Sequence, residues 1–316
     1  MTRKLALTFV LIAALLTTLS ACGFSPPSGG GSSGGSSSGS TSAGGPIIVG
    51  SKSFTENILI GDMMYDLLQA NLKGATIENK SNLGGTMVPW NAIQSGQVDM
   101  YCEYTGTGLV DILKQPPTGN PDVAYQTVKT QYPQKFHIEW LNPLGFNDTY
   151  AIAVPQSIAQ QYNLKTISDL APVASKLVFG AEPEYYTRPD GYAGLVSQYG
   201  LHFGSKKELN VGLKYEAVGT NQVQVIDVFS TDGQLIKYNM VVLQDDKHFF
   251  PPYYAAPIVR EDTLKAYPEV STILNKLAGK FTDEAMQKLN YQVDVQHQSA
   301  DTVAKQFLVS QGLLSS

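Results

Sequence analysis

The strongest constraint on the fold of this chain is an alternation of strand-like and helix-like segments, which occurs in two successive sets. The first set opens with the apolar run 47–49 and continues with apolar residues at helical spacing over 58–68. The second set opens with the strand-like segment 149–154, continues with a helix expected over 221–229 and returns to a strand at 240–243. Alternating strands and helices are typical of α/β proteins, so the two sets predict two α/β lobes.

The N-terminus has the features of an export signal. A short basic stretch precedes an apolar run over 5–19, which is too short for a comfortable membrane-spanning helix. The segment 19–22, Leu-Ser-Ala-Cys, resembles the lipobox of bacterial lipoproteins, in which the signal is cut before the cysteine and the cysteine is lipidated. The resemblance implies a signal peptide over 1–21 and lipid attachment at Cys22. An ordinary secretory signal with an incidental cysteine is the alternative.

A tether is expected between the signal and the alternating segments. After Cys22 the chain consists almost wholly of Gly, Ser and Pro up to residue 45. Such a segment has no hydrophobic periodicity and almost nothing to bury, so we expect a flexible tether over 22–45. The folded part of the protein is therefore expected to begin near residue 46.

The composition excludes two further classes of protein. Of the 316 residues, 43% are hydrophobic, which is enough for one large or two smaller domains and excludes disorder of the whole chain. Lys and Arg number 22 against 27 Asp and Glu, so no basic excess is available to neutralise nucleic-acid phosphates. We therefore expect no nucleic-acid partner.

The sequence offers few candidates for catalysis or metal binding. Its four histidines, His137, His202, His248 and His297, are scattered, and none has the spacing of a metal-binding motif. Cys102 lies beside an expected strand without an evident histidine partner, which favours a buried structural thiol. We expect no catalytic residue, no metal and no cofactor. An extracellular α/β hydrolase is a rival interpretation.

Four loops at the ends of expected strands each carry aromatic residues. They are 103–107, 146–150, 229–233 and 249–254. Such loops are where α/β sheets bind ligands. Several ring faces around one point attract a quaternary ammonium group, at about 0.5–2 kcal/mol per ring, because this cation cannot donate hydrogen bonds and is easily desolvated. The spacing alone leaves an alternative in which the rings only fill the core between loops.

Seven sequence runs follow one another along the folded region, namely 50–56, 83–86, 103–109, 148–151, 188–192, 229–233 and 245–253. Together they resemble those of the substrate-binding proteins of osmoprotectant ABC importers, the glycine betaine/carnitine/choline type. The resemblance implies a two-lobed α/β fold of the periplasmic-binding-protein type (type II), with two hinge crossings, that closes on its ligand. It places lobe 1 at about 46–149 plus 258–316 and lobe 2 at about 150–257.

The resemblance assigns four candidate residues to an aromatic cage. Tyr104, Tyr150 and Tyr253 match cage tyrosines of the family. Phe229 falls where the family usually has a fourth tyrosine, so it keeps the ring face and lacks the hydroxyl. Cation binding should survive this change, whereas a hydrogen bond from that corner is lost.

The resemblance also assigns a polar end to the site. Lys52, Thr107 and Arg188 match the positions that hold the polar end of the ligand. Two cations in a pocket for a cation are reasonable if the ligand also carries a carboxylate, which favours a glycine betaine-like zwitterion. Carnitine, choline and ergothioneine are the alternative ligands. The alternative roles are a plain surface lysine for Lys52 and a structural ion pair for Arg188.

The implied function is that of an extracytoplasmic receptor. It would capture a quaternary-ammonium solute and deliver it to an ABC permease and its ATPase, both encoded elsewhere. We expect a monomer that is anchored to the cell membrane through the lipid at Cys22 and that makes and breaks no bonds. An adhesin or structural lipoprotein with a protein partner is a second rival interpretation.

Overall fold

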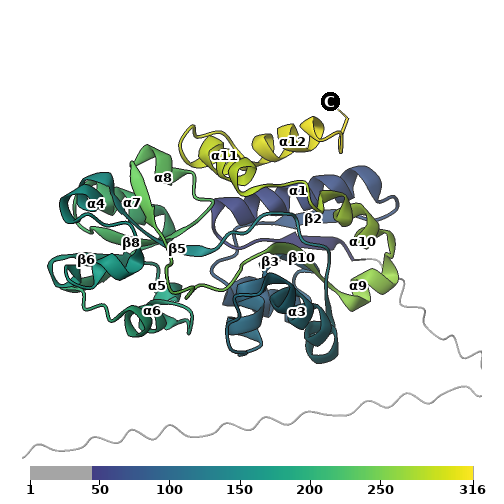
Figure 1. Cartoon of the computed structure of the whole chain (residues 1–316). Coiled ribbons are helices and arrows are strands. Elements are labelled where there is room, and N and C mark those ends of the chain that lie inside the picture. The colour runs from purple at the N-terminus through teal and green to yellow at the C-terminus, as the bar shows by residue number, and fades with distance from the viewer. Residues whose placement is uncertain (1–44, 316) are drawn as a thin grey trace, which may run out of the picture. The chain divides into compact units, whose positions relative to one another are not determined.

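The structure is a computed structural model that describes residues 45–315, and these residues form two five-stranded sheets (Figure 1). The first sheet contains β1 (Ile47–Gly50), β2 (Ile77–Lys80), β3 (Met100–Tyr104), β4 (Ile138–Trp140) and β10 (Ala255–Arg260). Its strand order is β2-β1-β3-β10-β4. Strand β1 is parallel to β2 and β3, whereas β10 is antiparallel to β3 and β4.

The second sheet repeats this plan. It contains β5 (Tyr150–Pro155), β6 (Val178–Ala181), β7 (Ser205–Glu208), β8 (Val225–Phe229) and β9 (Met240–Leu243). Its strand order is β7-β6-β8-β5-β9, and β5 is antiparallel to both of its neighbours. The two mixed sheets with their helices confirm the predicted two-lobed α/β fold. We call the first sheet with its helices the first lobe, and the second sheet with its helices the second lobe.

Segment 221–229 is not the predicted helix. Its second half is β8, which lies between β6 and β5 and is buried along its whole length. The sequence of a strand that is covered on both faces is a nearly continuous run of apolar residues. Hydrophobic periodicity cannot distinguish such a run from a buried helical segment, which explains the error.

Helices flank both sheets. In the first lobe they are α1 (Thr55–Asn71), α2 (Met87–Gln94), α3 (Pro121–Phe136), α9 (Glu261–Ala266), α10 (Glu269–Leu274), α11 (Asp283–Asp294) and α12 (Ala300–Ser310). In the second lobe they are α4 (Gln156–Tyr162), α5 (Pro183–Thr187), α6 (Tyr192–Tyr199), α7 (Lys214–Gly219) and α8 (Gln234–Lys237). A π-helical turn covers Thr107–Ile112, and 3₁₀ turns cover Ile167–Leu170, Ala174–Lys176, Val211–Leu213 and Asn275–Leu277.

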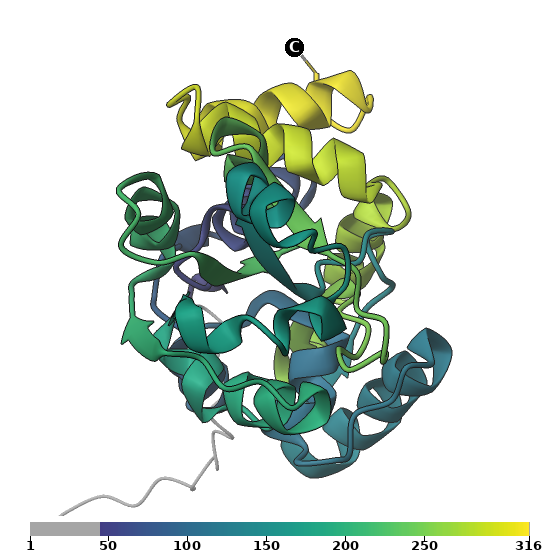
Figure 2. The ribbon, with the colours of Figure 1, turned by 60° about the vertical axis from the view of Figure 1, so that its left-hand side comes forward.

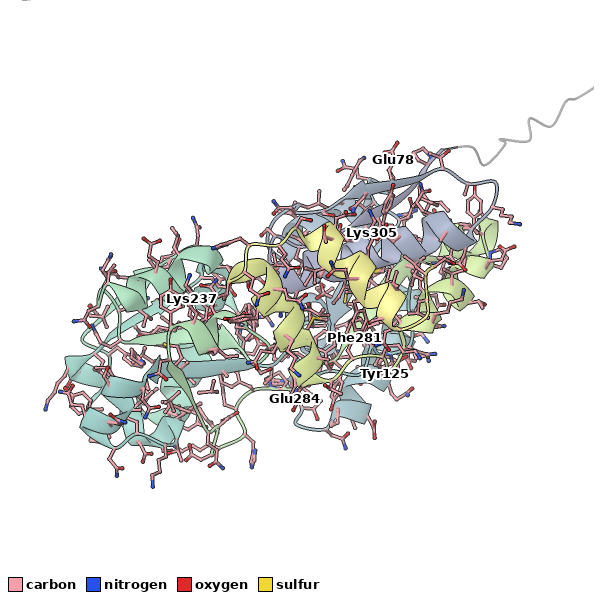
Figure 3. All side chains as sticks on the ribbon, turned by 90° about the horizontal axis from the view of Figure 1, so that it is seen from above. Glu78, Tyr125, Lys237, Phe281, Glu284 and Lys305 are labelled. Carbon is pink, nitrogen blue, oxygen red and sulfur yellow. The ribbon has the colours of Figure 1, made fainter. Side chains whose placement is uncertain are left out.

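The C-terminal helices return to the first lobe. Helix α1 packs on β1 and β3 and also contacts α10, α11 and α12. Figures 1 and 2 show α11 and α12, in yellow, beside α1, and Figure 3 shows the same pair from above. The division into 46–149 plus 258–316 and 150–257 remains our proposal for the lobe boundaries.

Two segments connect the lobes, as expected for two hinge crossings. The first, 141–149, leads from β4 to β5, and the second, 244–254, leads from β9 to β10. The two crossings pair with each other, because Asn147 forms an antiparallel bridge with Tyr254 and its Oδ1 accepts a hydrogen bond from Tyr253 N at 2.7 Å. The crossings therefore hold the starts of β5 and β10 close together.

Some of the sequence predictions concern residues outside the range that the structure describes. The predicted signal peptide and the lipid site at Cys22 lie outside the described residues, as does the tether up to residue 44. Within residues 45–315, no helix has the length and the apolar character that a membrane crossing requires.

The turn between α5 and α6 is closely packed around Gly191. A Cβ atom at this position would lie 2.0 Å from the backbone oxygen of Tyr185. The Gly191 N–H also donates to the Arg188 oxygen at 3.1 Å. Because the obstacle is backbone, a side chain here requires a shift of the turn that carries Arg188 and Asp190.

We predict that Gly191→Ala destabilises the protein. Overpacking of this kind costs about 1–3 kcal/mol, so the free energy of unfolding should fall by that amount in chemical denaturation. Gly119→Ala is the matched control, because a Cβ there would meet nothing within 4 Å. Equal stability of the two variants would contradict the close packing of the turn.

Candidate functional site

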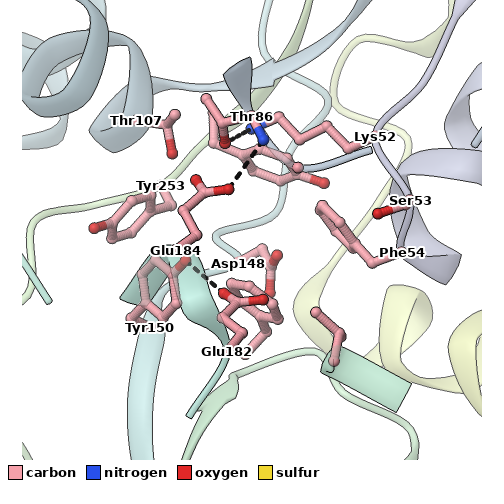
Figure 4. A pocket seen from close by; sticks show the side chains of 14 residues that line it. Lys52, Ser53, Phe54, Thr86, Thr107, Asp148, Tyr150, Glu182, Glu184 and Tyr253 are labelled. Atoms are coloured by element: carbon pink, nitrogen blue, oxygen red, sulfur yellow. Dashed lines mark hydrogen bonds between the residues drawn. The ribbon is translucent and has the colours of Figure 1, made fainter. Parts of the chain in front are cut away.

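A cavity with an empty volume of about 460 Å³ lies where the strand ends of both sheets meet (Figure 4). This volume includes space that is open to solvent. Residues from both lobes and from both crossings contribute to the wall. The lining residues are Lys52, Ser53, Phe54, Gly85, Thr86, Tyr104, Thr107, Asp148, Tyr150, Glu182, Glu184, Val211, Phe229 and Tyr253.

The four predicted cage residues all line this cavity. Tyr104 ends β3, Tyr150 begins β5, Phe229 ends β8, and Tyr253 lies just before β10. Strand pairing brings them together, because Tyr150 is directly opposite Phe229 in the antiparallel pair β5–β8. Their ring centroids are 4.8 Å apart, and those of Tyr150 and Tyr253 are 5.5 Å apart.

Phe54 supplies a fifth ring that the sequence interpretation missed. It directly precedes α1, and its ring centroid lies 5.9 Å from that of Tyr104 and 5.4 Å from that of Phe229. The five rings therefore form a continuous series along the wall. The sequence did contain a feature that could have identified Phe54, because this residue lies in the run 50–56, just after the expected end of a strand.

The hydroxyl groups of the three cage tyrosines point to acids and not to solvent. Burial raises the pKa of all three phenols well above the usual value, so that they stay protonated donors at neutral pH. Fixed phenols leave the ring faces as the surface that the wall presents. The pairs are Tyr104 with Glu56 (2.8 Å), Tyr150 with Glu182 (2.9 Å) and Tyr253 with Asp190.

Lys52 lies at the cavity wall and already has an acidic partner. Its Nζ donates to Glu103 Oε1 at 2.6 Å and to Thr86 Oγ1 at 3.0 Å, and the side chain is only 5% exposed. It is therefore not the surface lysine of the alternative interpretation. Nζ also lies 5.3 Å from the centroid of the Tyr104 ring.

Arg188 lies behind the wall and is paired as well. Its Nε and Nη2 atoms donate to the two carboxylate oxygens of Asp190 at 2.8 and 2.7 Å. Its guanidinium carbon is 5.4 Å from the centroid of Tyr150 and 5.9 Å from that of Tyr253. Nη1 reaches Thr107 Oγ1 at 3.4 Å. Arg188 thus has the structural ion pair of the alternative interpretation and contacts the cage from outside.

These pairings remove one argument about the ligand. The sequence interpretation inferred a ligand carboxylate from the presence of two cations, Lys52 and Arg188, in the pocket. In the structure Glu103 balances Lys52, and Asp190 balances Arg188. The two positive charges therefore no longer distinguish a zwitterion from a simple cation.

The cavity wall also carries acids that the sequence interpretation did not assign. Asp148 comes from the first crossing, while Glu182 and Glu184 come from the segment between β6 and α5 and from α5 itself. Burial raises the pKa of Glu182 to about 7. Acids of this kind are difficult to find in a single sequence, because only packing shows that they face the same space as the rings.

A buried polar network connects the cage to both lobes. The hydroxyl of Thr231, in the loop after β8, contacts Asp148 Oδ1 at 2.6 Å and Glu56 Oε2 at 2.5 Å. Asn290 of α11 donates to the same oxygen of Glu56 at 3.3 Å. A hydroxyl group has one proton, so two such contacts with acids require a proton on one of the carboxyls. Burial raises the pKa of Glu56 to about 7 and that of Asp148 well above its usual value, consistent with a shared proton.

We predict that stability decreases as the pH rises through neutrality. A carboxyl whose pKa is raised from 4.5 to about 7 on folding stabilises the protein fully below pH 4.5, and this contribution is lost as the pH approaches 7. Each pKa unit corresponds to about 1.4 kcal/mol. Between pH 5 and 8, the free energy of unfolding should therefore fall, and Glu56→Gln should make the fall smaller.

The comparison of the unmodified protein with Glu56→Gln isolates the pair of Glu56 and Asp148, because these two acids share a proton. Glu182, Asp66 and Asp294 also have raised pKa values, of about 7, 6 and 6, and they contribute equally to the pH dependence of both proteins. Urea denaturation at a series of pH values measures the slope. Identical slopes would show that Glu56 does not add to the number of protons that the protein takes up on folding.

The chain is similar in sequence and in structure to several known proteins. A family model described as the substrate-binding domain of ABC-type glycine betaine transport systems matches residues 45–310. The carnitine transport binding protein OpuCC of Listeria monocytogenes (serotype 1/2a, strain 10403S) is 37% identical over 264 residues, which cover 83% of this chain and 85% of that protein. A crystal structure of a glycine betaine/carnitine/choline ABC transporter is 33% identical, with a TM-score of 0.70 over 84% of this chain and 99% of that chain.

A longer relative matches over part of its length. The ergothioneine transport permease/ergothioneine binding protein EgtU of Helicobacter pylori (strain G27) is 39% identical over 269 residues. The match covers 85% of this chain and 48% of that protein, so the chain spans about half of the relative. Since the family model covers nearly all of the described residues, the chain belongs to the family of substrate-binding domains of ABC-type glycine betaine transport systems.

Proposed function

We propose that this protein captures a quaternary-ammonium solute in the aromatic cavity and delivers it to the permease of an ABC importer. The observation that carries the proposal is that Tyr104, Tyr150, Phe229 and Tyr253, from four separate strand ends, line one cavity. The membership in a family of solute-binding domains supports binding, and not bond-making, as the activity.

The chemistry of the wall suits an onium head group. A trimethylammonium group donates no hydrogen bonds, so it loses little when ring faces replace water, and each ring contributes about 0.5–2 kcal/mol. Carboxylates lie behind the rings, where they accept hydrogen bonds from the phenols of Tyr104, Tyr150 and Tyr253. Among the acids that line the cavity, Glu184 has a lowered pKa, and its negative charge adds to the attraction for a cation.

Ligand binding and lobe closure are expected to be one event. Tyr104 and Phe54 belong to the first lobe, whereas Tyr150 and Phe229 belong to the second. A ligand that contacts both sets of rings stabilises the closed arrangement over an open one, which shifts the population toward closure. The paired crossings provide the hinge.

The proposed partners and location follow from the family and from the N-terminal sequence. A substrate-binding domain needs a permease and an ATPase, so transport requires further subunits or domains. An extracytoplasmic position suits this role. We further propose lipid anchoring through Cys22, supported by the apolar run and the lipobox-like residues that precede it. The ligands named for the relatives, carnitine and ergothioneine, are candidates alongside glycine betaine and choline.

We predict that Tyr104→Ala lowers the affinity for the preferred ligand by about tenfold or more, because a ring contact of 1–2 kcal/mol is lost. Tyr104→Phe should retain most of the affinity, since the ring face remains. Isothermal titration calorimetry with glycine betaine, carnitine, choline and ergothioneine measures the effect.

The control is a ring outside the cavity. Tyr125 lies on α3 of the first lobe (Figure 3) and is not among the residues that line the cavity, and its hydroxyl donates to the Leu141 oxygen at 3.0 Å. Tyr125→Ala should leave the affinity unchanged. If Tyr104→Ala also left it unchanged, the rings would be core residues and not a cage.

A further inference from the structure

One carboxylate in the cavity is held by Thr86 and by Arg188, and Arg188 is one of the residues expected to hold the polar end of a ligand. Glu184 belongs to α5 of the second lobe, and its Oε2 accepts a hydrogen bond from the Thr86 N–H of the first lobe at 2.9 Å. Its Oε1 accepts from Arg188 Nη1 at 3.3 Å. Figure 4 shows Glu184 reaching across the cavity towards Thr86. The same Arg188 atom contacts Thr107.

The place occupied by Glu184 has the character of an anion site. The Thr86 N–H lies just before α2, where the helix dipole favours negative charge. Gly85 permits the close approach, because a Cβ atom there would lie 2.9 Å from Glu184 Oε2. A side-chain carboxylate thus fills a space that is shaped for a carboxylate.

Glu184 is ionised at neutral pH. Burial acts to raise its pKa, but the positive charge of Lys52, the bonds with Thr86 and the charge of Arg188 together outweigh burial and lower the pKa below the usual value. Since Glu103 and Asp190 already balance Lys52 and Arg188, the Glu184 charge is a surplus negative charge in the cavity.

We propose that Glu184 is a specificity-determining residue that competes with the carboxylate of a ligand for the Thr86 N–H. A zwitterion such as glycine betaine binds at the polar end only by displacing Glu184, and it then brings a second negative charge beside the first. A simple onium ligand such as choline leaves Glu184 in place and is balanced by its charge. This inference rests on the proposed function, because it assumes that the onium head binds in the cage.

The test compares Glu184→Gln with the unmodified protein by calorimetric titration with choline and with glycine betaine at pH 7. The amide keeps an oxygen that accepts from Thr86 but removes the charge. We expect the ratio of the Kd for choline to the Kd for glycine betaine to rise by about tenfold or more. Glu208→Gln, on the exposed strand β7, removes one charge from the same lobe and should leave the ratio unchanged.

A second variant keeps the proposal testable if Glu184→Gln fails to fold. Glu184→Asp keeps the charge, but its shorter side chain withdraws the carboxylate from Thr86. It should therefore move the ratio in the same direction as Glu184→Gln, by a smaller factor. An unchanged ratio in both variants, or a fall in the ratio, would overturn the role of Glu184.

The two proposals fail in different ways. If the unmodified protein bound neither choline nor glycine betaine nor the larger trimethylammonium ligands, the proposed function would be wrong. If it bound them and the ratio did not respond to residue 184, only the inference about Glu184 would be wrong.

Discussion

The cavity depends on the hydrogen bonds between buried tyrosine hydroxyls and buried carboxylates. A buried phenol without a partner costs about 1–3 kcal/mol, so each tyrosine of the wall needs an acceptor behind it. Once that acceptor is in place, the hydrogen bond fixes the orientation of the ring. Phe229 needs no acceptor, and its ring instead stacks on Phe54 and has Lys214 Nζ 5.3 Å from its centroid.

Carboxyl groups also affect the sign of the charge around the cavity. Each cation close to the wall is neutralised by a partner of its own, Lys52 by Glu103 and Arg188 by Asp190. Glu184, whose pKa is lowered, biases the site towards cations. In the proposed function, the arrangement separates two tasks, because the rings would recognise the onium head while Glu184 would set how well a negative group on the ligand is tolerated.

The same residues that form the cavity also connect the lobes. Thr231 of the second lobe contacts Glu56 of the first lobe and Asp148 of the first crossing, and Glu56 holds the hydroxyl of Tyr104. A change in the proton shared by the two acids thus acts on the cage and on the hinge together. In the proposed function, closure and recognition are coupled because they use one set of contacts.

The sequence by itself determined the α/β class, the two lobes and the positions of the four rings, because alternating apolar runs and strand-end motifs are local properties of the chain. Local patterns failed where burial removes periodicity, so that the strand β8 was interpreted as a helix. Only the tertiary structure decided which charges face each other. The pairs Lys52 with Glu103 and Glu184 with Thr86 join residues 51 and 98 positions apart, and no local pattern encodes such contacts.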